Sequence, residues 1–321
     1  MDKRFFLKSS LATTVALGTG MSFAADNSSS APIKIVVPFS PGGSNDVFAR
    51  ALAQRLSEKI KRTVIVENKP GAGGAIGASF VSKSAADGTT LLLTSVSFLT
   101  NSAIQSKPAY DPVKSFTPVA MLNRGPMLVI VKGDSRYDTI AKLIDGIQKK
   151  EINTYASAGL GTVAQMATEM INKNLNANIV HVPYKGVSNA ATDIIGGNVD
   201  MMITTAASVA GQIKSNHIRA LAVTSAEASS FFPGVVPLAK HIPGIDVESW
   251  WGVFAAPNTP AEIINSLNKE IREVSKTKQM ADIFDRESTV AGDMSPEEFR
   301  KFIEFEKKRW MDLAKERGIV A

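Results

Sequence analysis

A unit made of a strand, a glycine corner and a helix constrains the fold of this chain more than any other feature, because it occurs twice. The first copy is IKIVVPFSPGGSNDVFARALAQRL at residues 33–56. The second is INTYASAGLGTVAQMATEM at residues 152–170, more than 100 residues further along the chain. In each copy an apolar run leads into a pair of glycines and then into an amphipathic pattern. The repetition predicts two α/β lobes, each of which presents one corner to a shared cleft.

The residues of the first corner exclude a nucleotide phosphate loop. Such a loop needs Lys-Ser or Lys-Thr after its second glycine, whereas Ser44, Asn45 and Asp46 follow Gly43 and the next lysine is Lys59. The corner instead offers backbone N–H groups at a helix N-terminus, which suits a small anion. Asp46 has two interpretations, a ligand contact or a carboxylate that favours the first turn of its helix.

Apolar runs and helical patterns alternate along the rest of the chain. Several of the runs are continuously apolar, which is typical of strands covered on both faces in an α/β sheet. The last helix is predicted to begin with a capping box of Ser295 and Glu298, with Pro296 at its first position. The predicted strands cover residues 33–39, 63–67, 89–95, 119–122, 127–132, 152–157, 179–183, 199–205, 218–224 and 251–256.

Composition narrows the functional class. The 321 residues are 44% hydrophobic and 21% charged, which is the balance of a soluble globular protein with room for two lobes. The net charge is +6, but the basic residues are scattered, so we expect no nucleic-acid binding. The chain has no cysteine, and its three histidines lack metal-ligand spacing. We therefore expect no disulfide, no metal site and no cofactor.

The N-terminus has the layout of a secretory signal peptide. Lys3, Arg4 and Lys8 precede a short apolar run at residues 11–21, and the small residues around Phe23 predict cleavage after Ala24. The run is too short to span a bilayer. The basic stretch also resembles a twin-arginine signal, so the export route stays open. We expect the mature protein in the periplasm.

Other motifs favour structural interpretations. The glycines of GAGGAIG at residues 71–77 do not have the dinucleotide-binding spacing, and a sharp turn is favoured. No G-x-S-x-G elbow and no nucleophile–base–acid set is apparent, which argues against an enzyme. Lys185 either neutralises an acid or is an ordinary exposed lysine. Trp250 and Trp251 either admit an aromatic acid or belong to the core.

Taken together, the motifs resemble those of the solute-binding proteins of tripartite tricarboxylate transporters, the Bug or TctC family. The similarity runs in family order across nearly the whole mature chain, in the segments VPFSPGGSNDVFAR, VENKPGAGGAIGASFVSKSAADGTTLLLT, YASAGLGT, VPYKGVSNAATDIIGGNVD, RALAVTS, WWGVFAAPNTPAEIINSLN and SPEEFRKFIEFEKKRW. The sequence departs from the family pattern at Gln165, where a histidine is common, and at Lys240, where an acid is usual.

The resemblance implies an α/β, two-lobed periplasmic binding protein fold of type II (Venus flytrap). Residues 25–128 plus 252–321 would form lobe 1 and residues 129–251 lobe 2, after a signal peptide at residues 1–24. The implied function is the capture of a small carboxylated solute (a di- or tricarboxylate, an amino acid or an aromatic acid) by a monomer that delivers it to integral membrane permease subunits. A periplasmic sensor with the same fold and an exported enzyme are the alternatives.

The resemblance also implies where the solute binds. In the family the first corner holds a carboxylate through backbone amides, and the second corner and the ends of two further strands line the cleft. The implied ligand-binding residues are Phe39, Ser40, Pro41, Gly42, Gly43, Ser44, Asn45, Asp46, Ser95, Ser97, Ser157, Gly161, Thr162, Gln165, Tyr184, Thr204 and Thr205.

Overall fold

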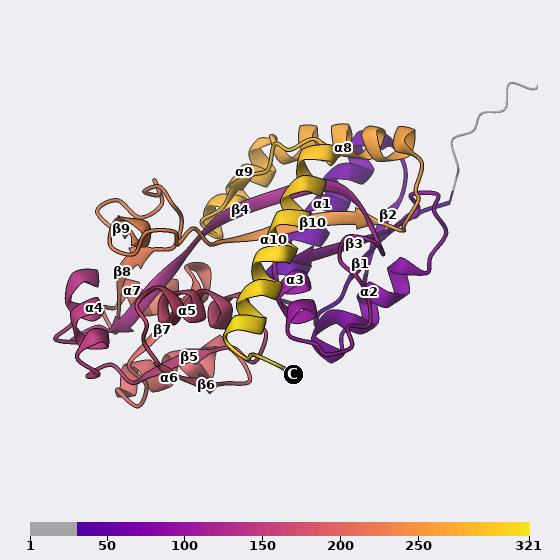
Figure 1. Ribbon diagram of the computed structural model, residues 1–321. Coiled ribbons are helices and arrows are strands. Elements are labelled where there is room, and N and C mark those ends of the chain that lie inside the picture. Colours follow the sequence, from indigo (N-terminus) through magenta and orange to yellow (C-terminus); the bar gives the residue numbers. More distant parts are fainter. Residues whose placement is uncertain (1–30) are drawn as a thin grey trace, which may run out of the picture. The chain divides into compact units, whose positions relative to one another are not determined.

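Strand β4 (Thr117–Lys132) pairs with strands of two groups and so connects the two groups. The computed structural model describes residues 31–321, and the predicted signal peptide lies outside the described residues. The first part of β4 pairs with β10 (Glu248–Ala255), and its second part pairs with β7 (Met201–Thr205) and β8 (Ile218–Val223). All three pairings are antiparallel, and Figure 1 shows β4 running from one group of elements into the other.

Parallel strands extend both groups. On one side the order is β2-β1-β3-β10-β4, and on the other it is β4-β7-β5-β6, with β8 and β9 also attached. The further strands are β1 (Ile33–Val37), β2 (Val64–Asn68), β3 (Thr90–Ser95), β5 (Thr154–Ser157), β6 (Val180–Pro183), β9 (Val236–Pro237) and β11 (Val290–Ala291). Within each group the strands that precede a corner, β1 and β5, have neighbours on both sides, which fixes the position of the corner.

Helices connect the strands and cover the sheets. They are α1 (Ser44–Ile60), α2 (Ala75–Ser82), α3 (Ser97–Ala103), α4 (Ile140–Gln148), α5 (Val163–Asn174), α6 (Val187–Gly196), α7 (Ala210–Lys214), α8 (Ala261–Ser275), α9 (Lys278–Arg286) and α10 (Pro296–Glu316), with short 3₁₀ turns η1 (Ala72–Gly74), η2 (Ala207–Val209) and η3 (Leu238–Lys240). No helix among residues 31–321 is long and apolar enough to cross a membrane.

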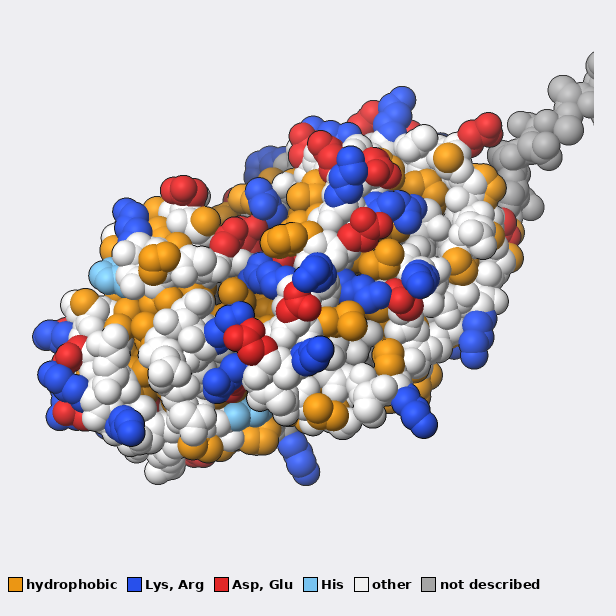
Figure 2. Space-filling view, in the orientation of Figure 1, with side chains coloured by type: hydrophobic (Ala, Val, Ile, Leu, Met, Phe, Trp, Pro, Cys, Tyr) orange, Lys and Arg blue, Asp and Glu red, His pale blue; other side chains and the backbone are white. Residues whose placement is uncertain are grey.

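Helix α10 begins as its sequence predicts. Ser295 accepts from the backbone N–H of Glu298, and the Glu298 carboxylate accepts from the backbone N–H of Ser295. The helix lies across the structure between α3 and α5 (Figure 1). Its C-terminal end is tied to α5 because Arg317 Nε lies 2.9 Å from Glu169 Oε2. Acidic and basic side chains alternate along the exposed face of α10 in Figure 2, which agrees with the scattered charges of the sequence.

The large aromatic side chains form the core. Trp250 and Trp251 on β10 are 1% and 5% exposed, so the core interpretation of both tryptophans is correct. The Trp251 ring meets Phe48 of α1 edge to face at 4.8 Å, and Trp250 meets Phe299 of α10 at 6.0 Å. The two faces of β10 thus pack into two hydrophobic clusters, one that includes α1 of the first corner and one that includes α5 of the second corner.

Candidate functional site

The first corner joins β1 to α1 and leaves backbone donors free. Gly42 has a φ of +90°, a left-handed conformation that favours glycine, and Gly43 caps α1 without a side-chain hydrogen bond. The N–H groups of Gly43, Ser44 and Asn45 find no partner among the described residues. These groups also carry the partial positive charge of the helix N-terminus. Ser44 does not cap α1 with its side chain, since its hydroxyl donates to Glu287 Oε2 at 2.9 Å.

The Asp46 side chain stabilises the first corner by hydrogen bonds. Its carboxylate accepts from the N–H of Gly42 at 3.0 Å, from Arg50 at 2.9 Å and from the Asn68 amide at 2.9 Å. The hydrogen bond from Arg50 is the main cause that lowers the pKa of Asp46 to about 2, and the bonds from Gly42 and Asn68 add to it. Both carboxylate oxygens are thus engaged within the corner, which supports the structural interpretation of Asp46. Beside it, Asn45 Oδ1 is buried without a partner in the described part of the chain.

The second corner joins β5 to α5 and repeats this design. Gly159 and Gly161 have φ values of +135° and +76°, and Thr162 is the N-cap that accepts from the N–H of Gln165. The Gln165 side chain in turn accepts from the N–H of Gly161 at 2.7 Å. This bond matches that from Gly42 to Asp46, since each runs from a corner glycine to the side chain four residues on.

Free donors remain at the second corner as well. The N–H groups of Leu160, Thr162, Val163 and Ala164 have no hydrogen-bond partner within residues 31–321. Both corners therefore present unpaired backbone N–H groups at the start of a long helix. Neither corner contains an arginine or a lysine.

A serine–histidine pair that no sequence motif reveals adjoins the second corner. Ser157 is fully buried, and its Oγ lies 2.6 Å from Nε2 of His181 on β6. The His181 ring stacks on Tyr155 at 4.9 Å, and Tyr155 donates to Glu169 at 2.7 Å. Burial lowers the pKa of His181, which keeps the ring neutral, while the charge of Glu169 acts weakly in the opposite direction.

This pair supports the corner. Ser157 Oγ accepts from the N–H of Gly159 at 3.1 Å, so the hydroxyl holds the corner backbone in place. Glu169 hydrogen-bonds Tyr155 and pairs with Arg317, and it makes no hydrogen bond with His181. The stacking of Tyr155 on His181 follows from the strand register, because the two residues lie opposite each other on the adjacent parallel strands β5 and β6.

The other predicted site residues lie at strand ends. Ser95 ends β3 and Ser97 begins α3, while Thr204 and Thr205 end β7. The Thr205 hydroxyl is 2.7 Å from that of Ser208.

Tyr184 follows β6 and reaches α6. Its hydroxyl donates to Asp193, and its N–H donates to the carbonyl of Ser157 at 2.9 Å. Burial, followed by the bond to Asp193, raises the pKa of Tyr184 to about 12. The next residue, Lys185, is exposed and makes no ion pair with any described residue.

Contacts through η1 and α3 connect the two corners. Phe39 of the first corner packs against Gly74, where an added Cβ would lie 3.3 Å from the ring. Asn101 of α3 donates to the carbonyl of Gly73 at 3.0 Å. An added Cβ on Gly161 would lie 2.5 Å from Asn101 Oδ1, so the second corner touches the same asparagine.

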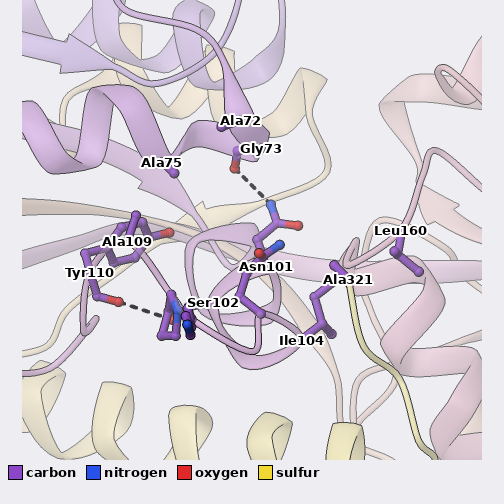
Figure 3. A pocket seen from close by; sticks show the side chains of 13 residues that line it. Ala72, Gly73, Ala75, Asn101, Ser102, Ile104, Ala109, Tyr110, Leu160 and Ala321 are labelled. Atoms are coloured by element: carbon purple, nitrogen blue, oxygen red, sulfur yellow. Dashed lines mark hydrogen bonds between the residues drawn. The ribbon is translucent and has the colours of Figure 1, made fainter.

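A hollow of about 370 Å³ lies at this junction (Figure 3). It is lined by η1 and the first residue of α2, by the end of α3, by the loop at residues 107–110, by Leu160 of the second corner and by Ala321. Among residues 31–321 no group of three His, Asp or Glu side chains is placed to hold a metal ion.

Comparison with known proteins gives consistent matches. The family described as the tripartite tricarboxylate transporter family receptor matches residues 48–319. The Bordetella pertussis protein BugT is 33% identical over 305 residues, which cover 94% of each chain. The structure of the periplasmic binding protein BugD superposes with a TM-score of 0.75 at 29% identity, covering 90% of this chain and 98% of that one. The R. palustris protein Rpa4515, solved with adipate, superposes with a TM-score of 0.78 at 30% identity over the same shares.

Proposed function

We propose that this chain, which belongs to the tripartite tricarboxylate transporter receptor family, captures a small carboxylated solute outside the cytoplasm and delivers it to membrane permease subunits. Membership confirms the family resemblance predicted from the sequence. The solved relatives confirm the two-lobed α/β fold of the periplasmic binding proteins, and with it a general role in solute binding.

Two sets of unpaired N–H groups carry the proposal. They lie at the N-termini of α1 and α5, at residues 43–45 and at residues 160 and 162–164, and each set can donate several hydrogen bonds to one carboxylate. A hydrogen bond to a charged group contributes about 1.5–3 kcal/mol. A few such bonds at each corner therefore bind a dissolved acid without help from a cationic side chain. The adipate held by the similar R. palustris protein belongs to the same chemical class.

The cleft and its closure belong to the same proposal. Residues 25–128 with 252–321 and residues 129–251 would move about β4 and β10, the two strands near the boundaries. Ser95 and Ser97 would face the solute from the first lobe, and Thr204 and Thr205 from the second. Contacts from both lobes exist together only when the cleft is closed, so the solute favours closure.

Within residues 31–321 the Ser157–His181 pair is the feature that most favours an enzyme, and its geometry argues against hydrolysis. A nucleophile must be accessible, whereas Ser157 is fully buried and its oxygen already accepts from Gly159. We therefore propose binding without turnover, by a monomer exported through its signal peptide.

Calorimetry with a panel of mono-, di- and tricarboxylates tests the proposal. At least one acid should bind and be recovered unchanged after incubation. Gly43→Val places a β-branched side chain at the first corner and should weaken that binding at least tenfold. Lys185→Ala should change it less than threefold. The amide-binding hypothesis fails if Lys185→Ala abolishes affinity while Gly43→Val leaves it intact.

A further inference from the structure

We propose that the hollow beside the second corner receives the apolar part of the solute, so that this chain selects carboxylic acids with an apolar chain or ring over small hydroxy acids. This inference rests on the proposed function and adds a solute class to it. The hollow, at about 370 Å³, falls within the size range of small-molecule pockets.

The walls of the hollow are mostly apolar. Ala72, Ala75, Ile104, Ala109 and Leu160 line it from four separate segments (Figure 3). Such a surface gains free energy when it is covered by apolar atoms of a ligand. A hydroxyl group placed against these apolar side chains would lose its hydrogen bonds to water.

Three of the polar side chains that line the hollow are already engaged by the protein. Asn101 donates to the carbonyl of Gly73, and the Tyr110 hydroxyl donates to the carbonyl of Phe98 at 3.0 Å. The Ser102 hydroxyl points to the carbonyl of Tyr110 at 3.5 Å (Figure 3). A solute with several hydroxyls would have to compete with these bonds, whereas an apolar chain would leave them intact.

Leu160 belongs both to the second corner and to the lining of the hollow. Its backbone lies between Gly159 and Gly161, and its N–H is one of the unpaired donors of the second corner. Its side chain is 46% exposed and lines the hollow. An acid bound through the Leu160 N–H would therefore lie next to a residue whose side chain lines the hollow. Gln105 and Lys107 also line the hollow, and both side chains are exposed. If the end of the solute remote from the bound carboxylate is polar, it would meet water there.

Calorimetry with straight-chain carboxylates from butyrate to octanoate, and with malate, tests the inference on the whole purified chain. Each methylene that enters the hollow should tighten binding about fourfold, the equivalent of about 0.8 kcal/mol per buried CH₂ group. Octanoate should then bind more tightly than butyrate and malate.

Two variants and a matched control locate the effect. Leu160→Ala should weaken octanoate binding about tenfold and butyrate binding less than twofold. Ala109→Phe, in an exposed loop, should fill the hollow and remove the dependence on chain length. Ile76→Ala truncates another exposed apolar side chain, at 56% exposure and outside the lining, and should change neither affinity.

The outcomes separate this inference from the proposed function. If malate binds and affinity does not rise with chain length, the hollow is not a solute subsite, although carboxylate binding stands. Equal losses in Leu160→Ala and Ile76→Ala also overturn the inference. If no carboxylate binds at all, the proposed function fails and the inference fails with it.

Discussion

Replacing Gly161 by alanine tests the contact between the second corner and α3. The backbone at Gly161 has a φ of +76°, which costs an alanine about 1–2 kcal/mol. The new Cβ would also lie 2.5 Å from Asn101 Oδ1 and 2.6 Å from Ile104 Cδ1, well inside van der Waals contact. Overpacking of this kind typically costs a further 1–3 kcal/mol. The free energy of unfolding should therefore fall by about 2–5 kcal/mol.

Gly197→Ala is a control matched in backbone geometry. Gly197 has a φ of +75°, and the nearest atom to its added Cβ is Lys132 Cδ at 4.0 Å. Both variants therefore pay the free-energy cost of an alanine at positive φ, but only Gly161→Ala introduces a steric clash. Urea denaturation followed by tryptophan fluorescence should show Gly161→Ala to be less stable than Gly197→Ala by about 1–3 kcal/mol, with the same slope. Equal midpoints would show that the second corner does not press against Asn101.

The remaining predictions concern the second corner and its supports. Thr162→Ala and Thr139→Ala each remove a helix N-cap, and in thermal denaturation each should lower the free energy of unfolding by about 0.5–2 kcal/mol. Only Thr162→Ala should also weaken the binding of an acid in calorimetry. Gln165→Glu keeps an oxygen to accept from the corner and adds a negative charge, so calorimetry should show weaker acid binding above pH 6 and recovery toward pH 4. The pKa of His181 is lowered in the folded chain, so below pH 6.5 the unfolded chain takes up a proton on this histidine before the folded chain does. The free energy of unfolding should therefore fall as the pH drops from 6.5 through the folded pKa. His181→Gln should reduce this dependence of the urea midpoint on pH. Saturation with a bound acid should reduce the radius of gyration in X-ray scattering, and an unchanged radius would contradict closure.

The sequence predicts local features well because neighbouring residues determine them. Both corners are recognisable, since two glycines stand directly before a helix in each, and in the second corner a capping threonine follows them. The box at Ser295 is fixed by residues three apart, and the structure confirms it. The apolar runs at residues 119–122 and 127–132 predict two strands, however, and the structure joins them in β4. The polar residues between them are read as a break, but the chain stays extended there because β10 pairs with it up to Pro126.

Features that depend on tertiary pairing cannot be predicted from local sequence patterns. Ser157 and His181 meet only because β5 and β6 are neighbours, and no local pattern specifies that pairing. The hollow needs five segments, most of them distant in sequence, so in the sequence its apolar lining is a set of unrelated residues. Asp46 illustrates a middle case: its place in the first turn suggests either of two roles, and the bonds from Gly42, Arg50 and Asn68 are needed to favour one.

The matching bonds within the two corners have unequal electrostatic consequences. In the first corner the side chain that accepts from the glycine N–H is the carboxylate of Asp46, and Arg50 offsets its charge from an exposed position. In the second corner the acceptor is the neutral amide of Gln165. Each corner keeps its glycine in place, but only the first already holds an anion at its helix N-terminus, where it reduces the attraction for another. The free amides around Thr162 therefore offer a solute carboxylate the more favourable potential, and the hollow opens beside the same corner.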